Sequence, residues 1–365
     1  MKRILVINLG STSSKLALCE DTTVVKERTF HHDTKRLHAM HGAEEIAAFF
    51  GDVVDTFLHC EGVDMSAVDA LAVRGMGKNG SYHHGAYLLT KQVLDDCISG
   101  PILHVGLFAS TVIGAKLSRA YGIPAYLYDV VFTDEILPIA RITGVPYYRR
   151  NVASHTLNCR AAARMAAEQM GKRLEDTRFI VSHLGGGFGT MALEGGVIVD
   201  TYSAEEGSFT PERAGRIPQG LVAALYSDPD RSPEELRRIL KEDVGMFGWL
   251  GTSDCAEAER RIAAGDQLAK RVYEAMAYQV SKDICAMGAL FCGRVDAIIL
   301  TGGVAHSSMF TGWIEQRTAH LAPVRIMPGS FEMEALAGGV CRVLRGEETI
   351  NSYDDVEAYE FFARH

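Results

Sequence analysis

Three short apolar runs, each followed by a turn rich in glycine or hydroxyl side chains, constrain the fold of this chain most strongly. The first run, Ile4–Ile7, leads through such a turn to a second extended run that opens at Lys15. The other two are Val181–Leu184, followed by three glycines, and Leu300–Thr301, followed by two. Turns of this kind offer backbone N–H groups to phosphate. Together the three turns indicate one nucleotide held by three loops, which no single turn would establish.

The length and charge of the chain narrow the classes of protein to consider. With 365 residues, the chain is long enough for two cores, so two lobes with a cleft between them are expected. Apolar residues make up 47% and charged residues 23%, as in ordinary globular proteins. The net charge of -9 disfavours a nucleic-acid partner, which needs a basic face.

The cysteines and apolar segments predict a cytoplasmic protein. The eight cysteines show no C-x-x-C pair, which favours reduced, mostly buried thiols over a zinc site. The apolar run after Met1 ends at Asn8, too short for a signal peptide. The uncharged stretch Cys97–Ala115 contains glycines, a proline and a histidine, so no membrane span is expected.

Strand-like and helix-like patterns alternate in both halves of the chain. Strands are expected at Ala70–Val73, Ala125–Tyr128 and Phe179–Ser182, and the longest amphipathic helix over Asp266–Leu290. A closing helix is expected over Glu334–Leu344. This order predicts a mixed α/β fold with an approximate internal duplication.

The glycine-bearing turns admit two interpretations. The first turn carries phosphate donors at Ser11, Thr12, Ser13 and Lys15 but lacks a Walker pattern, and a plain structural hairpin is the alternative. After the triple glycine, Thr190–Leu193 is strand-like, so a dinucleotide fingerprint is rejected. Three consecutive glycines cost backbone entropy, which favours close approach to a ligand over a mere turn.

Four charged residues follow predicted strands or lie in turns: Arg74, Asp129, Arg213 and Glu334. Guanidinium groups bind carboxylate and phosphoryl groups, and Mg²⁺ takes one or two carboxylates with phosphates and water. For each residue alone, a surface charge or an ion pair is favoured over a role in a site. Only their arrangement in a family pattern makes them candidates.

Ordered motifs along nearly the whole chain resemble the acetate and butyrate kinase family, within the superfamily of sugar kinases, actin and Hsp70 ATPase domains. They are I-N-x-G-S-T-S-x-K at Ile7–Lys15, A-R-I-[ST]-G-x-P at Ala140–Pro146, H-x-G-G-G at His183–Gly187, [ST]-P-E-R-x-G at Thr210–Gly215, L-G-T-x-D at Leu250–Asp254, V-Y-E-A-M-A-Y-Q at Val272–Gln279, L-T-G-G-[IV]-A-H at Leu300–His306 and E-M-E-A-L-A at Glu332–Ala337. The butyrate kinase branch is the most similar.

The resemblance implies a duplicated, actin-like (ribonuclease H-like) fold of two lobes with the nucleotide in the cleft. The N-terminal lobe would span residues 1–155, with the phosphate hairpin and much of the acyl site, and the C-terminal helix can pack back on it. The C-terminal lobe, residues 156–365, would carry the nucleotide loops. The implied reaction is reversible, direct in-line phosphorylation of a short-chain carboxylate by ATP with Mg²⁺, giving an acyl phosphate and ADP. The protein is also expected to be a cytoplasmic homo-oligomer, a dimer or larger, with no nucleic-acid or membrane partner.

Residue roles follow from the same resemblance. Nucleotide and phosphate contacts fall to Asn8, Ser11, Thr12, Ser13, Lys15, His183, Gly185, Gly186, Gly187, Gly302 and Gly303. Arg74 and Arg213 would hold the carboxylate and the phosphoryl group, and His155 would steady the phosphoryl group in flight. Asp129 and Glu334 would serve the site and Mg²⁺. An ionised carboxylate needs no general base, so this set of cations suits the chemistry.

The resemblance places the acyl pocket at Met76, His104, Leu107, Phe108 and Arg216, and the chain departs from the branch pattern at Met76, in the stretch that follows His104, and at Arg216. The apolar residues could enlarge the pocket for a longer or branched acid, whereas Arg216 could serve a second negative charge. A third reading is a nucleotide-binding module with little transfer. A hydroxyl-directed kinase is a further rival, with Asp129 as its base, although the matched arginines argue against it.

Overall fold

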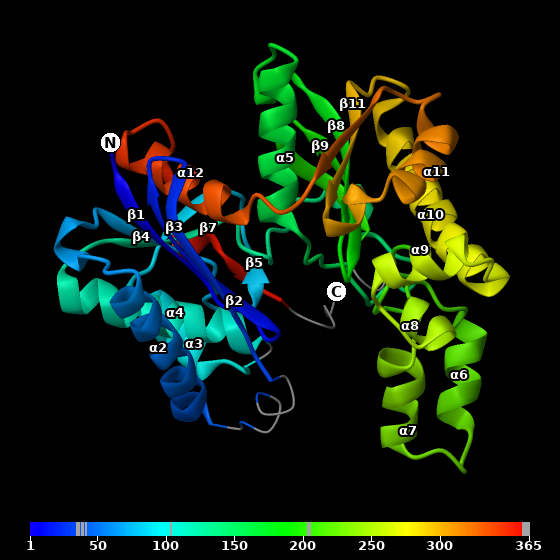
Figure 1. Cartoon of the computed structure of the whole chain (residues 1–365), viewed down its shortest axis with the longest axis horizontal. Coiled ribbons are helices and arrows are strands. Elements are labelled where there is room, and N and C mark those ends of the chain that lie inside the picture. The colour runs from blue at the N-terminus through cyan, green and yellow to red at the C-terminus, as the bar shows by residue number, and fades with distance from the viewer. Residues whose placement is uncertain (34–36, 38–39, 41, 103, 203–205, 360–365) are drawn as a thin grey trace. The chain divides into compact units, whose positions relative to one another are not determined.

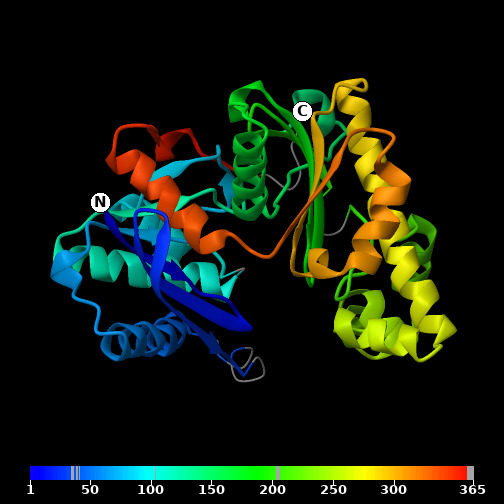
Figure 2. The same cartoon turned by 45° about the horizontal axis from the view of Figure 1, so that its top comes forward.

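The computed structural model describes residues 1–33, 37, 40, 42–102, 104–202 and 206–359 and contains two compact units (Figures 1 and 2). The first comprises Met1–Asp134, Tyr147–Asn151 and the segment from Phe331 onward. The second comprises Glu135–Pro146 and Val152–Ser330. These limits differ from a single division after residue 155, because the last segment of the chain belongs to the first unit.

The first unit is built on a mixed sheet in the order β13-β6-β7-β4-β1-β2-β3. Its strands are β1 (Arg3–Asn8), β2 (Ser13–Glu20), β3 (Thr23–His31), β4 (Ala70–Val73), β6 (Ala86–Leu88), β7 (Ala125–Tyr128) and β13 (Ile350–Asn351). Strands β1, β4 and β7 are parallel, whereas β1, β2 and β3 form an antiparallel meander. A separate ladder joins β5 (Gly80–Ser81) to β14 (Glu357–Ala358).

Helices cover both faces of this sheet. They are α2 (Ala43–Cys60), α3 (Lys91–Ser99), α4 (Val105–Tyr121) and α12 (Glu332–Leu344). Helices α4 and α12 both contact β1, β4 and β7. Figure 1 shows that they lie on opposite faces of the sheet. Ile4–Ile7 are fully buried between them, which explains why the β1 sequence is continuously apolar instead of alternating.

The second unit contains a sheet in the order β10-β9-β8-β11-β12. Its strands are β8 (Arg178–Leu184), β9 (Phe188–Glu194), β10 (Val197–Tyr202), β11 (Ala297–Gly302) and β12 (Val324–Pro328). Its helices are α5 (Thr156–Gln169), α6 (Gln219–Ser227), α7 (Pro233–Arg237), α8 (Gly245–Leu250), α9 (Cys255–Ala263), α10 (Gln267–Gly288) and α11 (Ser308–Thr318). Helices α5 and α10 both contact β8 and cover opposite faces.

Helix α10 shows how local sequence sets an element in this unit. Asp266 caps its first turn by accepting hydrogen bonds from the amides of Leu268 and Ala269. Val272, Met276 and Val280 then recur at a spacing of four and are buried against the sheet. The expected helix over Asp266–Leu290 is confirmed with slightly tighter bounds.

The two sheets repeat one topology. In the first, the β1-β2-β3 meander is extended by parallel β4 and β7; in the second, the β8-β9-β10 meander is extended by parallel β11 and β12. The predicted duplication is therefore present in the strand order. The hairpins β1-β2 and β8-β9 occupy equivalent positions, and each carries one of the predicted phosphate turns.

Candidate active site

The predicted site residues form two groups, one in each unit. In the first unit, Asn8 ends β1 and Arg74 directly follows β4, so the carboxyl ends of two parallel strands present them. The Arg74 Nη1 donates to Asn8 Oδ1 at 3.3 Å. The Asn8 Nδ2 donates to Glu332 Oε2 at 2.8 Å, and Arg74 Nη2 lies 3.8 Å from Glu332 Oε1. These three side chains form one connected polar cluster.

Glu332 was not among the predicted site residues, although Glu334 was. Both lie in the first turn of α12, where positions two apart point to different sides of the helix. Glu334 is exposed, whereas Glu332 contacts Asn8 and Arg74. The motif E-M-E offers two carboxylates, and the contacts in this unit favour the first of them for the cluster.

The turn between β1 and β2 is tight. A Cβ at Gly10 would lie 2.5 Å from Ser13 O, and a Cβ at Gly106 of α4 would lie 2.4 Å from Leu9 O. Ser11 and Thr12 are exposed and Ser13 is half-buried, as phosphate donors would need to be. Lys15 instead reaches Glu27 of β3, with 3.7 Å between Nζ and Oε1.

Asp129 follows β7 and is 5% exposed. Its Oδ1 accepts a hydrogen bond from Gly85 N at 2.8 Å, and its own amide donates to Gly85 O at 3.0 Å. Its φ of 44° places it in the left-handed region that non-glycine residues seldom occupy. The carboxylate thus helps to hold the strained end of β7.

The residues predicted to line the acyl pocket differ in exposure. Leu107 and Phe108 are buried in the core of the first unit, whereas His104 precedes α4 and is exposed. Met76 is buried and borders a cavity of about 220 Å³ with Lys78 and Asp96. The substitutions at Leu107 and Phe108 are therefore accommodated by core packing within this unit.

In the second unit, His155 and His183 are stacked. Their ring centres are 4.0 Å apart and the planes differ by 17°. Asn158 of α5 lies 3.0 Å from His183 Nδ1 through its Nδ2 and donates to Thr301 Oγ1 at 3.2 Å. Because an amide nitrogen can only donate, His183 Nδ1 accepts and the ring proton resides on Nε2. A Cβ at Gly185 would lie 3.0 Å from that Nε2.

The triple-glycine turn lies against Arg213. A Cβ at Gly187 would come within 2.6 Å of the Arg213 guanidinium carbon, so no other residue fits there without displacing Arg213. Thr210 links the two segments by donating its hydroxyl to Gly186 O at 2.8 Å and accepting from Arg213 N at 3.0 Å. Arg213 is exposed, and it forms no ion pair with any residue in the described part of the chain.

Arg216 has a different environment from Arg213. It forms an ion pair with Asp283 of α10, and its guanidinium carbon lies 4.9 Å from the ring centre of Tyr202. Asp283 is 1% exposed, and burial raises the pKa of its carboxyl while Arg216 opposes that rise. Arg216 was considered as a partner for a second negative charge on the substrate, and in this structure it is paired with Asp283 instead.

Gly302 and Gly303 end β11 as predicted for a nucleotide turn. Gly302 has a φ of 93°, and a Cβ there would lie 2.3 Å from Leu184 O at the end of β8. Nothing lies within 4 Å of a Cβ built at Gly303. Only glycine fits at position 302, because its φ is positive and a Cβ would clash with the backbone of Leu184. At Gly303 the space around a Cβ is open.

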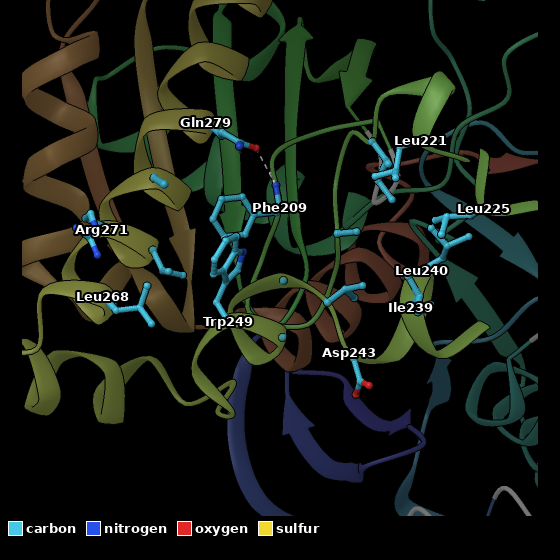
Figure 3. Close-up of a pocket in the computed structure, with 17 residues that line it drawn as sticks. Phe209, Leu221, Leu225, Ile239, Leu240, Asp243, Trp249, Leu268, Arg271 and Gln279 are labelled. Atoms are coloured by element: carbon cyan, nitrogen blue, oxygen red, sulfur yellow. Dashed lines mark hydrogen bonds between the residues drawn. The ribbon is translucent and has the colours of Figure 1, made fainter. Parts of the chain in front are cut away.

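Figure 3 shows an apolar groove in the same unit that the sequence reasoning missed. It has a volume of about 890 Å³ and lies among α6, α8 and α10. Phe209, Ala214, Leu221, Trp249 and Leu268 are among its lining residues. The apolar residues at i and i+4 of α6, Leu221 and Leu225, are the sequence signal that could have found it.

Comparison with known proteins identifies the family. A model of the acetokinase family matches residues 130–323. The chain is 37% identical over 354 residues to a probable butyrate kinase 2 from Caldanaerobacter subterraneus subsp. tengcongensis, which covers 97% of this chain and 100% of the relative. This chain belongs to the acetokinase family. The resemblance seen in the motifs is thereby confirmed, and the protein is an enzyme of the carboxylate kinase class that uses ATP.

Solved structures related to this acetokinase family member share its fold. A propionate kinase from Francisella tularensis subsp. tularensis matches with a TM-score of 0.74 and 18% identity, covering 93% of this chain and 99% of the other. An acetate kinase from Porphyromonas gingivalis matches with a TM-score of 0.75 at the same identity and coverage. The predicted actin-like α/β fold is confirmed.

Two further searches of the described residues concern metals and membranes. Across those residues, no three His, Cys, Asp or Glu side chains gather into a metal-binding group. A magnesium site built from one or two carboxylates and phosphates would not require such a group. Within the same ranges, no helix is long and apolar enough to cross a membrane.

Proposed function

We propose that this protein transfers the γ-phosphoryl group of ATP to a short-chain aliphatic carboxylate, in a reversible in-line reaction that yields an acyl phosphate and ADP. The observation that carries the proposal is Arg213: an exposed guanidinium, without an ion-pair partner in the described ranges, held against the triple-glycine turn at Gly187. An unpaired arginine beside backbone amides is suited to phosphoryl oxygens. Membership of the acetokinase family supports the same reaction.

The residues of each unit would have distinct tasks in this reaction. Arg74 would hold the carboxylate, with Asn8 and the turn at Ser11, Thr12, Ser13 and Lys15 near the transferred group. Arg213, His155 and the Nε2–H of His183 would neutralise the equatorial oxygens of the transition state, and Gly185–Gly187 and Gly302–Gly303 would bind the nucleotide. No general base is needed, because a carboxylic acid with a pKa near 4 is ionised at neutral pH.

The carboxylates of the first unit suit Mg²⁺. Asp129 and Glu332 supply the hard oxygen donors that this ion prefers. We propose Asp129 and Glu332 as the metal-associated acids, with Glu332 in the role predicted for Glu334. When bound, Mg²⁺ supplies charge neutralisation at the phosphate oxygens.

The surroundings of Arg216, Leu107 and Phe108 favour a short, singly charged acid. Asp283 already neutralises Arg216, and the two apolar residues lie in the core of the first unit. A longer acid remains the second candidate, since Met76 borders a cavity of about 220 Å³ in that unit. A cytoplasmic location and a homo-oligomeric state stay predictions from the family resemblance.

A direct assay tests the proposal. The protein is incubated with ATP, Mg²⁺ and each acid of a C2 to C6 series, and acyl phosphate is trapped with hydroxylamine as the hydroxamate. We expect a maximum with a short unbranched acid and a loss of about 10²-fold or more in the Arg213→Ala variant, which keeps its fold. Hydroxamate from no acid would favour a binding module, and wild-type turnover in the variant would refute the role of Arg213.

A further inference from the structure

Arg213 lies in a loop whose two ends are joined by backbone hydrogen bonds. The Arg216 amide donates to Gly207 O at 3.0 Å, and the Thr210 amide donates to Arg213 O at 3.0 Å. Gly215 adopts a φ of 64°, and a Cβ there would lie 2.5 Å from Phe209 N. We call residues 207–216 the arginine loop. Because these hydrogen bonds join the ends of the loop, a displacement of one end is expected to displace Arg213 as well.

Two side chains of α10 bind consecutive amides of the arginine loop. Asp283 Oδ2 accepts from Ser208 N at 2.7 Å, and Gln279 Oε1 accepts from Phe209 N at 3.2 Å. Residues four apart lie on the same side of a helix, so Gln279 and Asp283 form one row. Helix α10 is the longest helix of its unit and is anchored in its core, which makes this row a fixed support.

Asp283 is tied to the loop a second time through Arg216. Its Oδ1 accepts from Arg216 Nη2, and the Arg216 guanidinium also lies over the ring of Tyr202 in β10. A buried carboxylate is costly unless it is paired and hydrogen-bonded. Both oxygens of Asp283 are satisfied by the arginine loop, one at Ser208 and one at Arg216, and the loop is thereby held near each of its ends.

The arginine loop is also held by α8, where the Met246 amide donates to Thr210 O at 2.9 Å and the Phe247 amide to Pro211 O at 3.0 Å, and part of the loop borders the apolar groove. Phe209 and Ala214 line the groove of about 890 Å³, and Figure 3 shows the hydrogen bond from Phe209 to Gln279 at its wall. Side chains that face an open groove lose the contacts that a packed interior would give them. Phe209 also packs against the core of the unit, and the polar bonds from Asp283 to Ser208 and Arg216 add to that packing near the two ends of the loop.

We propose that Asp283, through Arg216 and the Ser208 amide, is a positioning residue that holds Arg213 in place for phosphoryl transfer. The inference rests on the proposed function, in which Arg213 contacts the transferred group. It also explains Arg216, a position at which this chain departs from the butyrate kinase pattern: this cation neutralises Asp283 and ties the arginine loop to α10. The substrate needs no second negative charge to account for it.

The test compares Asp283→Asn in two backgrounds. In the wild type, we expect kcat for hydroxamate-trapped acyl phosphate to fall about tenfold with KM for ATP nearly unchanged, since positioning acts in the transition state. In the Arg213→Ala background, the same substitution should change kcat by less than about twofold, because residues acting as a unit are non-additive. Arg216→Gly should reproduce the loss, and Arg216→Lys should restore most of the activity.

Glu274→Gln is the matched control. Glu274 also lies on α10 and binds Arg317 of α11 at 2.8 Å, without contact to the arginine loop. It should retain wild-type kcat, which separates positioning from a general loss of stability. If Asp283→Asn does not fold, Arg216→Gly and Arg216→Lys carry the test.

Three results would contradict either the positioning role of Asp283 or the role of Arg213 in phosphoryl transfer. An unchanged kcat in Asp283→Asn, or an equal fall in both backgrounds, overturns the positioning role while leaving the proposed function intact. Wild-type turnover in Arg213→Ala would instead refute the assignment on which this inference rests.

Discussion

Asn8 and Glu332 are joined by a 2.8 Å hydrogen bond although 324 positions separate them in the chain. Asn8 ends β1 of the first unit, and Glu332 opens the helix that packs on that strand. Arg74 lies against both residues. The last segment of the chain therefore returns to complete a polar cluster begun by its first strand.

This relationship predicts different outcomes for two neighbouring glutamates. Glu332→Gln removes the charge that faces Arg74 and Asn8, and we expect turnover to fall by about 10²-fold. Glu334→Gln changes an exposed side chain two positions later, and we expect turnover within about twofold of wild type. Hydroxamate assays at saturating ATP and Mg²⁺ measure both.

Thermal unfolding of the two glutamine variants provides the control, since both should melt within a few degrees of the wild type. The opposite order of activities would return the metal-associated role to Glu334. It would also show that the contacts of Glu332 are structural.

A second prediction concerns the space at Gly187. In Gly187→Ala, the added methyl would lie 2.6 Å from the Arg213 guanidinium carbon, so this side chain must move. We expect kcat to fall by more than about tenfold with the fold retained, because a displacement of about 1 Å at a catalytic group is that costly. Steady-state kinetics and far-UV circular dichroism measure the two quantities.

Gly220→Ala is the matched control, because nothing lies within 4 Å of a Cβ at that position. Alanine is also the better helix former, so this variant should be at least as stable as the wild type. Equal activity in the two alanine variants would mean that Arg213 is not constrained by the triple-glycine turn.

The sequence predicted those features of the fold and site that depend on local patterns. Apolar runs located the strands at Ala70–Val73 and Ala125–Tyr128 with the observed bounds. Contacts between residues that are far apart in the chain could not be predicted from the sequence. Glu332 contacts Asn8, 324 positions away, and Arg216 contacts Asp283, 67 positions away. A single sequence gives the positions of the charged residues along the chain, but it does not show which of their side chains are in contact in the fold.

Thiol labelling makes a third prediction. Cys60 and Cys292 are exposed, whereas Cys19, Cys97, Cys159 and Cys341 are buried, and all eight cysteines are free. Burial raises the pKa of Cys19 to about 12 and that of Cys97 to about 11, so little of either is thiolate near pH 8. We expect two fast equivalents with a disulfide reagent in the native protein and eight after denaturation.

The fast phase should disappear in the double variant Cys60→Ser with Cys292→Ser. Cys255 and Cys285 are half-buried, so a fast phase of more than four thiols in the wild type would show that a cysteine with a buried side chain becomes accessible in solution. It would thus contradict the packing described for the two cores.

The last prediction is a pH dependence of stability centred on His32. This ring lies 2.7 Å from Ser14 Oγ through Nε2 and contacts Phe49 and Phe50 edge-on. Burial lowers the pKa of His32 below its ordinary value, and the neighbouring His31 lowers it further. In the unfolded chain, the pKa returns to about 6.5. Between these two pKa values the unfolded state binds a proton that the native state does not.

Stability should therefore be complete above about pH 6.5 and decrease as the pH falls below it. His32→Gln keeps a hydrogen-bonding partner for Ser14 but cannot titrate, so the pH dependence of the free energy of unfolding in urea should be weaker below about pH 6.5 in this variant. An identical slope in wild type and His32→Gln would mean that His32 is protonated equally in both states and that its contacts with Ser14 and Phe50 do not exclude the charge.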